Sequence, residues 1–146
     1  MCDVSLSMPE GIYQYIFTTA LLLHPTHIYA GFYYGMKRCG IMGLALYATS
    51  LNYWRYPLIK SMRRKVDMIV AHSTIAYHLY LSLYATNKLQ TMVPLFVGSS
   101  MYGCSLFFSK KMWHKTSAFC HWLLHVLVSV GATLTYRDYY LHGVTY

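Results

Sequence analysis

Two histidines stand four residues apart at the start of an apolar run, in the stretch HWLLHVLVSVG of residues 121–131. At this spacing His121 and His125 share one face of a helix, so both imidazoles can point at one site. Imidazole is the commonest metal ligand among side chains, which makes the pair a candidate for part of a zinc site. A His pair facing the interior of a helix bundle can also hydrogen bond to Ser, Thr or backbone carbonyls without a metal. The pair alone leaves both interpretations open.

Two further polar residues fall at the ends of apolar stretches. Ser50 lies near the end of YATSLNYW, and Asp67 begins the apolar part of RRKVDMIVAHS. A carboxylate and two imidazoles at one depth of a bundle are suited to hold a divalent metal and its water. Asp67 also has a simpler interpretation, as an N-terminal helix residue that the macrodipole favours and that the preceding bases pair with.

The composition indicates that these residues belong to a membrane protein. The chain has 146 residues, of which 56% are hydrophobic and 11% are charged, whereas about 25% of the residues in a soluble domain are charged. The formal net charge of +8 would suggest nucleic acid as a partner for a soluble protein, but most Lys and Arg residues lie in short clusters between apolar runs. We therefore interpret the charge as a signal of membrane topology, and expect membrane lipids and no nucleic acid as partners.

The apolar stretches predict the fold class. Five can be marked, at residues 12–34, 40–54, 68–84, 92–108 and 118–136. Some are shorter than the ~20 residues of a spanning helix, and the second gains length only by extending back towards Met36. Ser, Thr, Tyr and His within these stretches indicate helices that present polar faces to one another. We predict an all-α fold, a polytopic membrane bundle of about five transmembrane helices that forms a single transmembrane domain over residues 1–146.

The basic residues predict the orientation of this bundle. With five spans, the loops on one side of the membrane carry Arg55, Lys60, Arg63, Arg64, Lys65, Lys110, Lys111 and Lys115. The opposite side carries Lys37, Arg38, Lys88 and Arg137. By the positive-inside rule the N-terminus is cytoplasmic and the C-terminus lies on the opposite side of the membrane. The first dozen residues lack the basic region of a signal peptide, so we expect the first helix to be retained.

A proline interrupts the first apolar stretch. Pro25 is expected to kink or break that helix, and the flanking His24 and His27 are expected to satisfy carbonyls freed by the kink rather than to bind a metal. The sequence also has four cysteines, Cys2, Cys39, Cys104 and Cys120. They lack CxxC spacing, so we expect small packing residues rather than disulfides or a zinc knuckle.

The blocks TSLNYW, RRKVDMIVAHS and HWLLHVLVSVG, in this order, resemble the CREST superfamily of membrane hydrolases and receptors. That superfamily includes alkaline ceramidases, progestin and adiponectin receptors and hemolysin-III-like proteins. Its members are similar in having a Ser in the second helix, usually a His four residues later, an Asp at the start of the third helix and HxxxH in the last helix. Ser50, Asp67, His121 and His125 stand at the matching positions.

The chain departs from the family pattern in two respects. The family fold has seven helices, and this chain has room for about five. Because an even number is missing, Asp67 and the His pair remain on one side of the membrane. Four residues after Ser50, where the family has a zinc-binding His, this sequence has Trp54, and indole cannot bind zinc. Asp67, or His114 seven residues before His121, would have to supply the third ligand.

The resemblance implies a zinc-dependent intramembrane hydrolase of lipid amides or esters. His121, His125 and Asp67 would bind the zinc, Asp67 would also position its water, and Ser50 would lie near the developing oxyanion. The alternative, which Trp54 and the small size favour, is a non-catalytic membrane protein that keeps the fold signature. It would act as an accessory or interaction subunit with membrane-protein partners. A pore or carrier is a third interpretation.

Overall fold

The structure is a computed structural model that describes residues 6–143, and this part of the chain folds into five helices. They are α1 (Glu10–Tyr33), α2 (Lys37–Trp54), α3 (Met62–Leu83), α4 (Lys88–Lys110) and α5 (His114–Leu141). The predicted all-α fold class and the predicted number of helices are therefore confirmed. The only pairing of extended backbone described is an isolated bridge between Leu6 and Leu58.

Each helix includes polar residues beyond its apolar stretch. α3 begins at Met62 because the Ser61 side chain accepts a hydrogen bond from the Arg64 backbone N–H at 3.2 Å, which satisfies a donor that the first turn leaves free. Asp67 therefore lies in the second turn of α3. The prediction that it begins this helix is wrong, and the macrodipole, which acts mainly on the first turn, does not explain its position.

Pro25 does not divide the first helix. α1 is continuous from Glu10 to Tyr33 with Pro25 inside it, so the predicted break is wrong. A proline inside a helix removes one backbone hydrogen bond, and neighbouring helices can compensate for that loss by packing. α1 packs against both α2 and α5.

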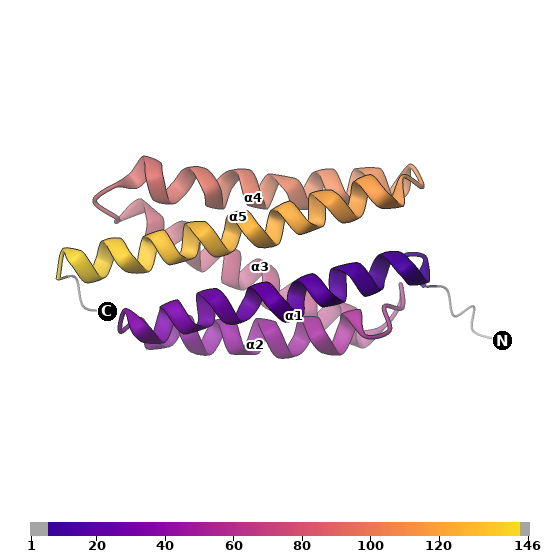
Figure 1. The fold of residues 1–146 in the computed structure, drawn as a ribbon, viewed down its shortest axis with the longest axis horizontal. Helices are drawn as coiled ribbons and strands as arrows, with labels where there is room; N and C mark the ends of the chain where they lie inside the picture. The colour runs from indigo at the N-terminus through magenta and orange to yellow at the C-terminus, as the bar shows by residue number, and fades with distance from the viewer. Residues whose placement is uncertain (1–5, 144–146) are drawn as a thin grey trace.

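The five helices form a closed ring in which each helix contacts its neighbours in the sequence and α5 returns to contact α1. α3 also contacts α5 across the ring. Figure 1 shows the α1–α2 and α4–α5 pairs running along the long axis, with α3 passing obliquely behind them. Consecutive helices are antiparallel, so α1, α3 and α5 begin at the end of the bundle where α2 and α4 end (Figure 1).

Glycines bring two pairs of helices into close contact. A Cβ atom added to Gly31 of α1 would lie 2.9 Å from the backbone nitrogen of Gly40 in α2. A Cβ atom on Gly98 of α4 would lie 3.0 Å from the Cβ atom of Leu127 in α5. Small residues at such crossings let helix backbones approach closely, which is the usual basis of helix packing in membranes.

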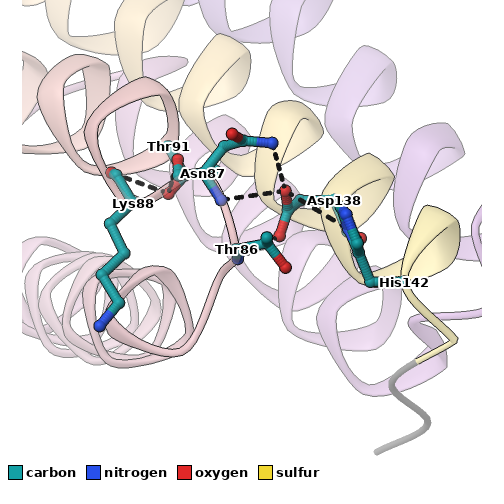
Figure 2. A network of polar contacts seen from close by, with 6 residues as sticks. All are labelled: Thr86, Asn87, Lys88, Thr91, Asp138 and His142. Carbon is teal, nitrogen blue, oxygen red and sulfur yellow. Dashed lines mark hydrogen bonds and ion pairs between the residues drawn. The ribbon is translucent and has the colours of Figure 1, made fainter.

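Hydrogen bonds between segments stabilise both ends of the bundle. At one end the Ser7 backbone N–H donates to the Pro57 carbonyl at 2.8 Å, and the Tyr53 hydroxyl donates to Ser7 Oγ at 3.1 Å. At the other end the Asp138 carboxylate of α5 accepts hydrogen bonds from the backbone N–H groups of Thr86 and Asn87 at 2.6 and 3.2 Å (Figure 2). Asp138 thereby holds the start of α4 against the end of α5.

The outer surface of the bundle exposes many large apolar side chains, and its interior holds polar side chains among apolar ones. Exposed large apolar side chains lie on every helix, among them Leu22, Tyr29, Ile41, Leu44, Ile69, Leu83, Leu89, Phe96, Phe107, Phe119 and Val130. Buried polar side chains include His24, His27, Ser50, Asp67, Thr74, His78, Ser105, Ser117, His121 and Ser129. Soluble proteins rarely combine so many exposed large apolar side chains with so many buried polar ones, because burial of polar groups costs free energy and exposed apolar patches associate.

Two of the five helices, α4 and α5, are long and apolar enough to cross a membrane by length and composition. α1, α2 and α3 have 24, 18 and 22 residues, so length does not exclude them. Their His, Tyr, Ser, Thr and charged residues lower the hydropathy below that of an ordinary spanning helix. A membrane association of the chain is thus supported by two helices rather than by the predicted five.

Candidate functional site

A cavity of about 200 Å³ lies between the five helices. It extends inward from the end of the bundle where α2 ends and α3 and α5 begin. Its polar lining includes His24 and His27 of α1, Ser50 of α2, Arg64 and Asp67 of α3, Tyr102 and Ser105 of α4, and His121, His125 and Ser129 of α5. The cavity therefore brings together Ser50, Asp67, His121 and His125, the four residues that the sequence singles out.

Ser50 and Asp67 form a direct pair inside this cavity. The Ser50 hydroxyl donates to Asp67 Oδ1 at 2.7 Å, and the two side chains are only 3% and 8% exposed. The last turn of α2 and the second turn of α3 meet because the connection between them is short. A serine hydroxyl has one hydrogen, so Ser50 cannot donate to an oxyanion while it donates to Asp67. In this arrangement Ser50 holds the carboxylate in place.

Four imidazoles continue the polar lining in a row. The ring centroids of His121 and His125 lie 4.8 Å apart, those of His125 and His24 4.8 Å, and those of His24 and His27 5.4 Å. His27 Nδ1 lies 3.1 Å from the hydroxyl of Ser129 on α5, so its partner is in another helix and not beside Pro25. The prediction for His24 and His27 is corrected accordingly: both face the cavity. His24 and His27 share the face of α1 that also buries Ile16, Ala20 and Gly31. This helical spacing is the sequence signal that indicates a position inside the bundle.

Part of this row has no partner in the protein. Both ring nitrogens of His24 and Nε2 of His125 are buried and lack a hydrogen-bond partner among the described residues. A buried polar group without a partner costs about 1–3 kcal/mol. The cavity is large enough for water and carries polar groups on its wall, so these nitrogens are placed to bind water or another polar ligand.

Trp54 occupies the position where the family pattern predicts a third zinc-binding imidazole. Its side chain lines the cavity and is 6% exposed, and its ring centroid lies 5.1 Å from that of His121 in an edge-on contact. The indole packs on one face of the candidate metal ligand. It offers no lone pair to a metal.

The described residues fit a metal only in part. His121 and His125 have the right chemistry and are neighbours, but no three His, Cys, Asp or Glu side chains between residues 6 and 143 form a group that could hold a metal ion. His114, the alternative third ligand, is the first residue of α5 and lies outside the cavity lining. Zinc bound by His121, His125 and Asp67 therefore stays a prediction.

The three cysteines between residues 6 and 143 lie outside the lining of the cavity. Cys39, Cys104 and Cys120 are free thiols, of which Cys39 and Cys120 are buried, and Cys2 lies outside the described residues.

No family model, curated protein or solved structure matches this chain. The resemblance to the CREST superfamily consequently rests on the three sequence blocks and stays a prediction.

Proposed function

We propose that this chain is a multi-pass membrane protein in which all five helices lie within the bilayer. The observation that supports the proposal is the exposure of large apolar side chains on all five helices together with the burial of histidines, serines and Asp67. In a bilayer the outer faces meet lipid, and ionisable residues are stable only where they face the bundle interior or a water-filled cavity. The polar lining that lowers the hydropathy of α1, α2 and α3 is then shielded from lipid by the ring of helices.

The orientation follows from the loops. Eight basic residues lie at the end of the bundle where the cavity opens, in the connections between α2 and α3 and between α4 and α5 or in the adjoining helix turns. By the positive-inside rule this end is cytoplasmic. An odd number of helices puts the end of α5 on the opposite side. The cavity would thus receive its ligand from the cytoplasmic half of the membrane.

For its activity, we propose hydrolysis of a lipid amide or ester in this cavity. The observation that carries this proposal is the meeting of the Ser50–Asp67 pair with His121 and His125 in one cavity between membrane helices. His121 and His125 are the side chains that would hold a zinc ion. Such an ion supplies a nucleophilic water at neutral pH and polarises a carbonyl. Asp67 has acceptor oxygens to orient a water, and Ser50 fixes the carboxylate.

One observation favours a second candidate. Trp54 packs against His121 inside the cavity, where it takes the place of a metal ligand. A chain that keeps the Ser50–Asp67 pair and the His pair but lacks the third imidazole fits a non-catalytic membrane protein. It would bind a lipid or a membrane-protein partner as an accessory subunit.

Metal analysis and hydrolysis of a panel of acyl amides and acyl esters in reconstituted vesicles separate the two candidates. The hydrolase requires that the wild-type chain contain zinc and release fatty acid, and that the double variant His121→Ala, His125→Ala lose both. His142→Ala, at the opposite end of the bundle, is the matched control and should keep both. Absence of zinc and turnover from the wild-type chain would refute the hydrolase and favour the accessory subunit.

A further inference from the structure

An arginine lines the cavity at the end of the bundle that carries most of the basic residues. Arg64 is half-buried in the first turn of α3, and its Nη1 donates to the Ile59 carbonyl at 3.0 Å. Among residues 6–143 it makes no ion pair with a carboxylate. A guanidinium carries several N–H donors in a planar fork, so Arg64 has donors left for another acceptor.

The charges around Arg64 favour an anion as that acceptor. Asp67 is the carboxylate in the described lining, and it lies one turn deeper along α3, where it accepts the Ser50 hydroxyl. Glu10 is the other acidic residue described at this end of the bundle, whereas the α2–α3 and α4–α5 connections are basic. A wall of this sign attracts and holds negatively charged groups.

Apolar side chains continue the lining inward from Arg64. Met68, Ala71 and Ile75 follow at spacings of four, three and four residues, which keeps them on the face of α3 that carries Arg64. The rise from Arg64 to Ile75 is about 16 Å at 1.5 Å per residue. Leu124 and Val128 of α5 add to this apolar lining. The cavity therefore offers one end to an anion and its depth to a hydrocarbon chain.

The cavity reaches the outer surface of the bundle between α3 and α4. His72 of α3 and Leu106 of α4 both line the cavity and are exposed. The ring of His72 contacts that of Tyr102 on α4 there, with centroids 5.3 Å apart. In the proposed membrane setting this surface meets lipid, so an acyl chain can enter from the bilayer. The volume of about 200 Å³ is smaller than the about 300–1,000 Å³ of most small-molecule sites, so a long chain would leave its end between α3 and α4.

We propose that this cavity binds N-acyl amino acids, which are single-chain lipid amides with a free carboxylate. The carboxylate pairs with Arg64, because the guanidinium fork matches its two oxygens. The amide lies at the level of Asp67 and the His pair, and the acyl chain follows Met68, Ala71 and Ile75. The inference deepens the proposed hydrolysis and rests on it for the position of the amide.

The spacing of the polar groups favours an amino acid as the headgroup. In an N-acylglycine the amide carbon and the carboxylate carbon are separated by three bonds of about 1.3–1.5 Å, so they lie less than about 4 Å apart. Arg64 and Asp67 are separated by a rise of about 4.5 Å along α3. The phosphate of a lysophosphatidic acid is separated from its ester by the whole glycerol unit and would extend beyond Arg64. A free fatty acid has no bond for the proposed hydrolysis to break.

Lipids that share one acyl chain test this inference by binding alone. The full chain is reconstituted in phosphatidylcholine nanodiscs with EDTA, and bound lipid is counted by native mass spectrometry against empty nanodiscs. We expect N-palmitoylglycine to bind at least about tenfold more tightly than the uncharged N-palmitoylethanolamine, because a charged partner strengthens the hydrogen bonds of Arg64. Palmitoyl lysophosphatidic acid should bind more weakly than N-palmitoylglycine.

Three variants make the test specific. Arg64→Gln should lower the affinity for N-palmitoylglycine by about tenfold and leave that for N-palmitoylethanolamine unchanged. Arg63→Gln is the matched control, because Arg63 is the adjacent arginine and lies outside the cavity lining. Ala71→Phe should weaken the binding of both lipids, because the phenyl ring would fill the space of the acyl chain. If Arg64→Gln does not reconstitute, the selectivity of the wild-type chain and the effect of Ala71→Phe decide.

Four results would overturn the inference: equal wild-type affinities for the two amides, an equal loss in Arg63→Gln, unchanged binding in Ala71→Phe, or tighter binding of the lysophosphatidic acid. The proposed hydrolase is tested separately by adding zinc to the same nanodiscs. Selective binding without release of palmitate would refute the hydrolase and keep this inference. Hydrolysis of both amides at equal rates and with equal affinities would keep the hydrolase and refute this inference.

Discussion

Replacing Trp54 by histidine tests whether the cavity is a zinc site that lacks one ligand. The substitution places an imidazole four residues after Ser50. At this position the wild-type indole contacts His121, with ring centroids 5.1 Å apart. Three imidazoles are a common protein ligand set for a catalytic zinc, and the fourth position is left to water. We therefore expect Trp54→His to bind zinc at least about tenfold more tightly than the wild-type chain, which corresponds to about 1.4 kcal/mol.

The expected loss in the free energy of unfolding of Trp54→His follows from the burial of Trp54. Trp54 is 6% exposed, so its indole is almost entirely packed. Truncation of a buried Trp to Ala costs about 3–5 kcal/mol, and because histidine refills part of the space we expect a loss of about 2–3 kcal/mol in the metal-free variant. Zinc at a hundred times its dissociation constant would restore about 2.7 kcal/mol. The variant should thus be less stable than the wild type with a chelator and about as stable with zinc.

Thermal unfolding in detergent micelles, with EDTA or with excess zinc, measures this difference directly. Trp122→His is the matched control, because it exchanges an indole for an imidazole on α5 at a residue outside the cavity lining. Its Tm should not respond to zinc more than the wild type does. The reasoning is refuted if zinc leaves the Tm of Trp54→His unchanged, or if it raises the Tm of Trp122→His equally.

Three further substitutions test the packing and the polar contacts by thermal or denaturant unfolding. Gly98→Ala should lower the free energy of unfolding by about 1–3 kcal/mol, because its Cβ would lie 3.0 Å from atoms of α5, whereas Gly103→Ala, with nothing within 4 Å, should raise it by about 0.5–1 kcal/mol. Changes of the same sign would contradict the close approach of α4 and α5. Asp138→Ala removes the acceptor of two backbone N–H groups before α4 and should lower the free energy of unfolding by about 1–2 kcal/mol. Hydrogen exchange at those two amides should become faster. Unchanged exchange would show that the contact is not formed. Ser50→Ala leaves the buried Asp67 carboxylate without its 2.7 Å partner and should cost about 1–3 kcal/mol. No loss would mean that water replaces the hydroxyl.

The number of helices could be predicted from the sequence because each helix contains one apolar run. The ends of the helices could not be predicted from hydropathy. α2 begins with Lys37 and Arg38, and α3 with the basic turn after Ser61, since charged residues continue a helix without cost when they face water. The side-chain cap at Ser61 is the local signal that hydropathy ignores.

The sequence could predict only those residues of the candidate site whose position follows from the helix topology alone. Ser50, Asp67 and His121 fall near the ends of apolar stretches that an antiparallel bundle must bring to one side, and they do share a cavity. The sequence assigns His24 and His27 to the proline between them, because sequence proximity favours a local partner. In the structure His24 and His27 contact α5, because α5 is the helix that packs against α1 and closes the ring. The spacing of residues within α1 does not indicate which helix will pack against it.

The closed ring has a consequence for biosynthesis. α5 is the last helix to leave the ribosome, yet it contributes His121, His125 and Ser129 to the cavity and packs against α1, the first helix made. Cotranslational folding can pair α1 with α2 and α2 with α3, but it cannot complete the ring before synthesis ends. Until then the imidazoles of α1 face an open groove. In the membrane setting proposed above, a nascent chain stalled before α5 would therefore expose His24 and His27 to lipid instead of to the cavity.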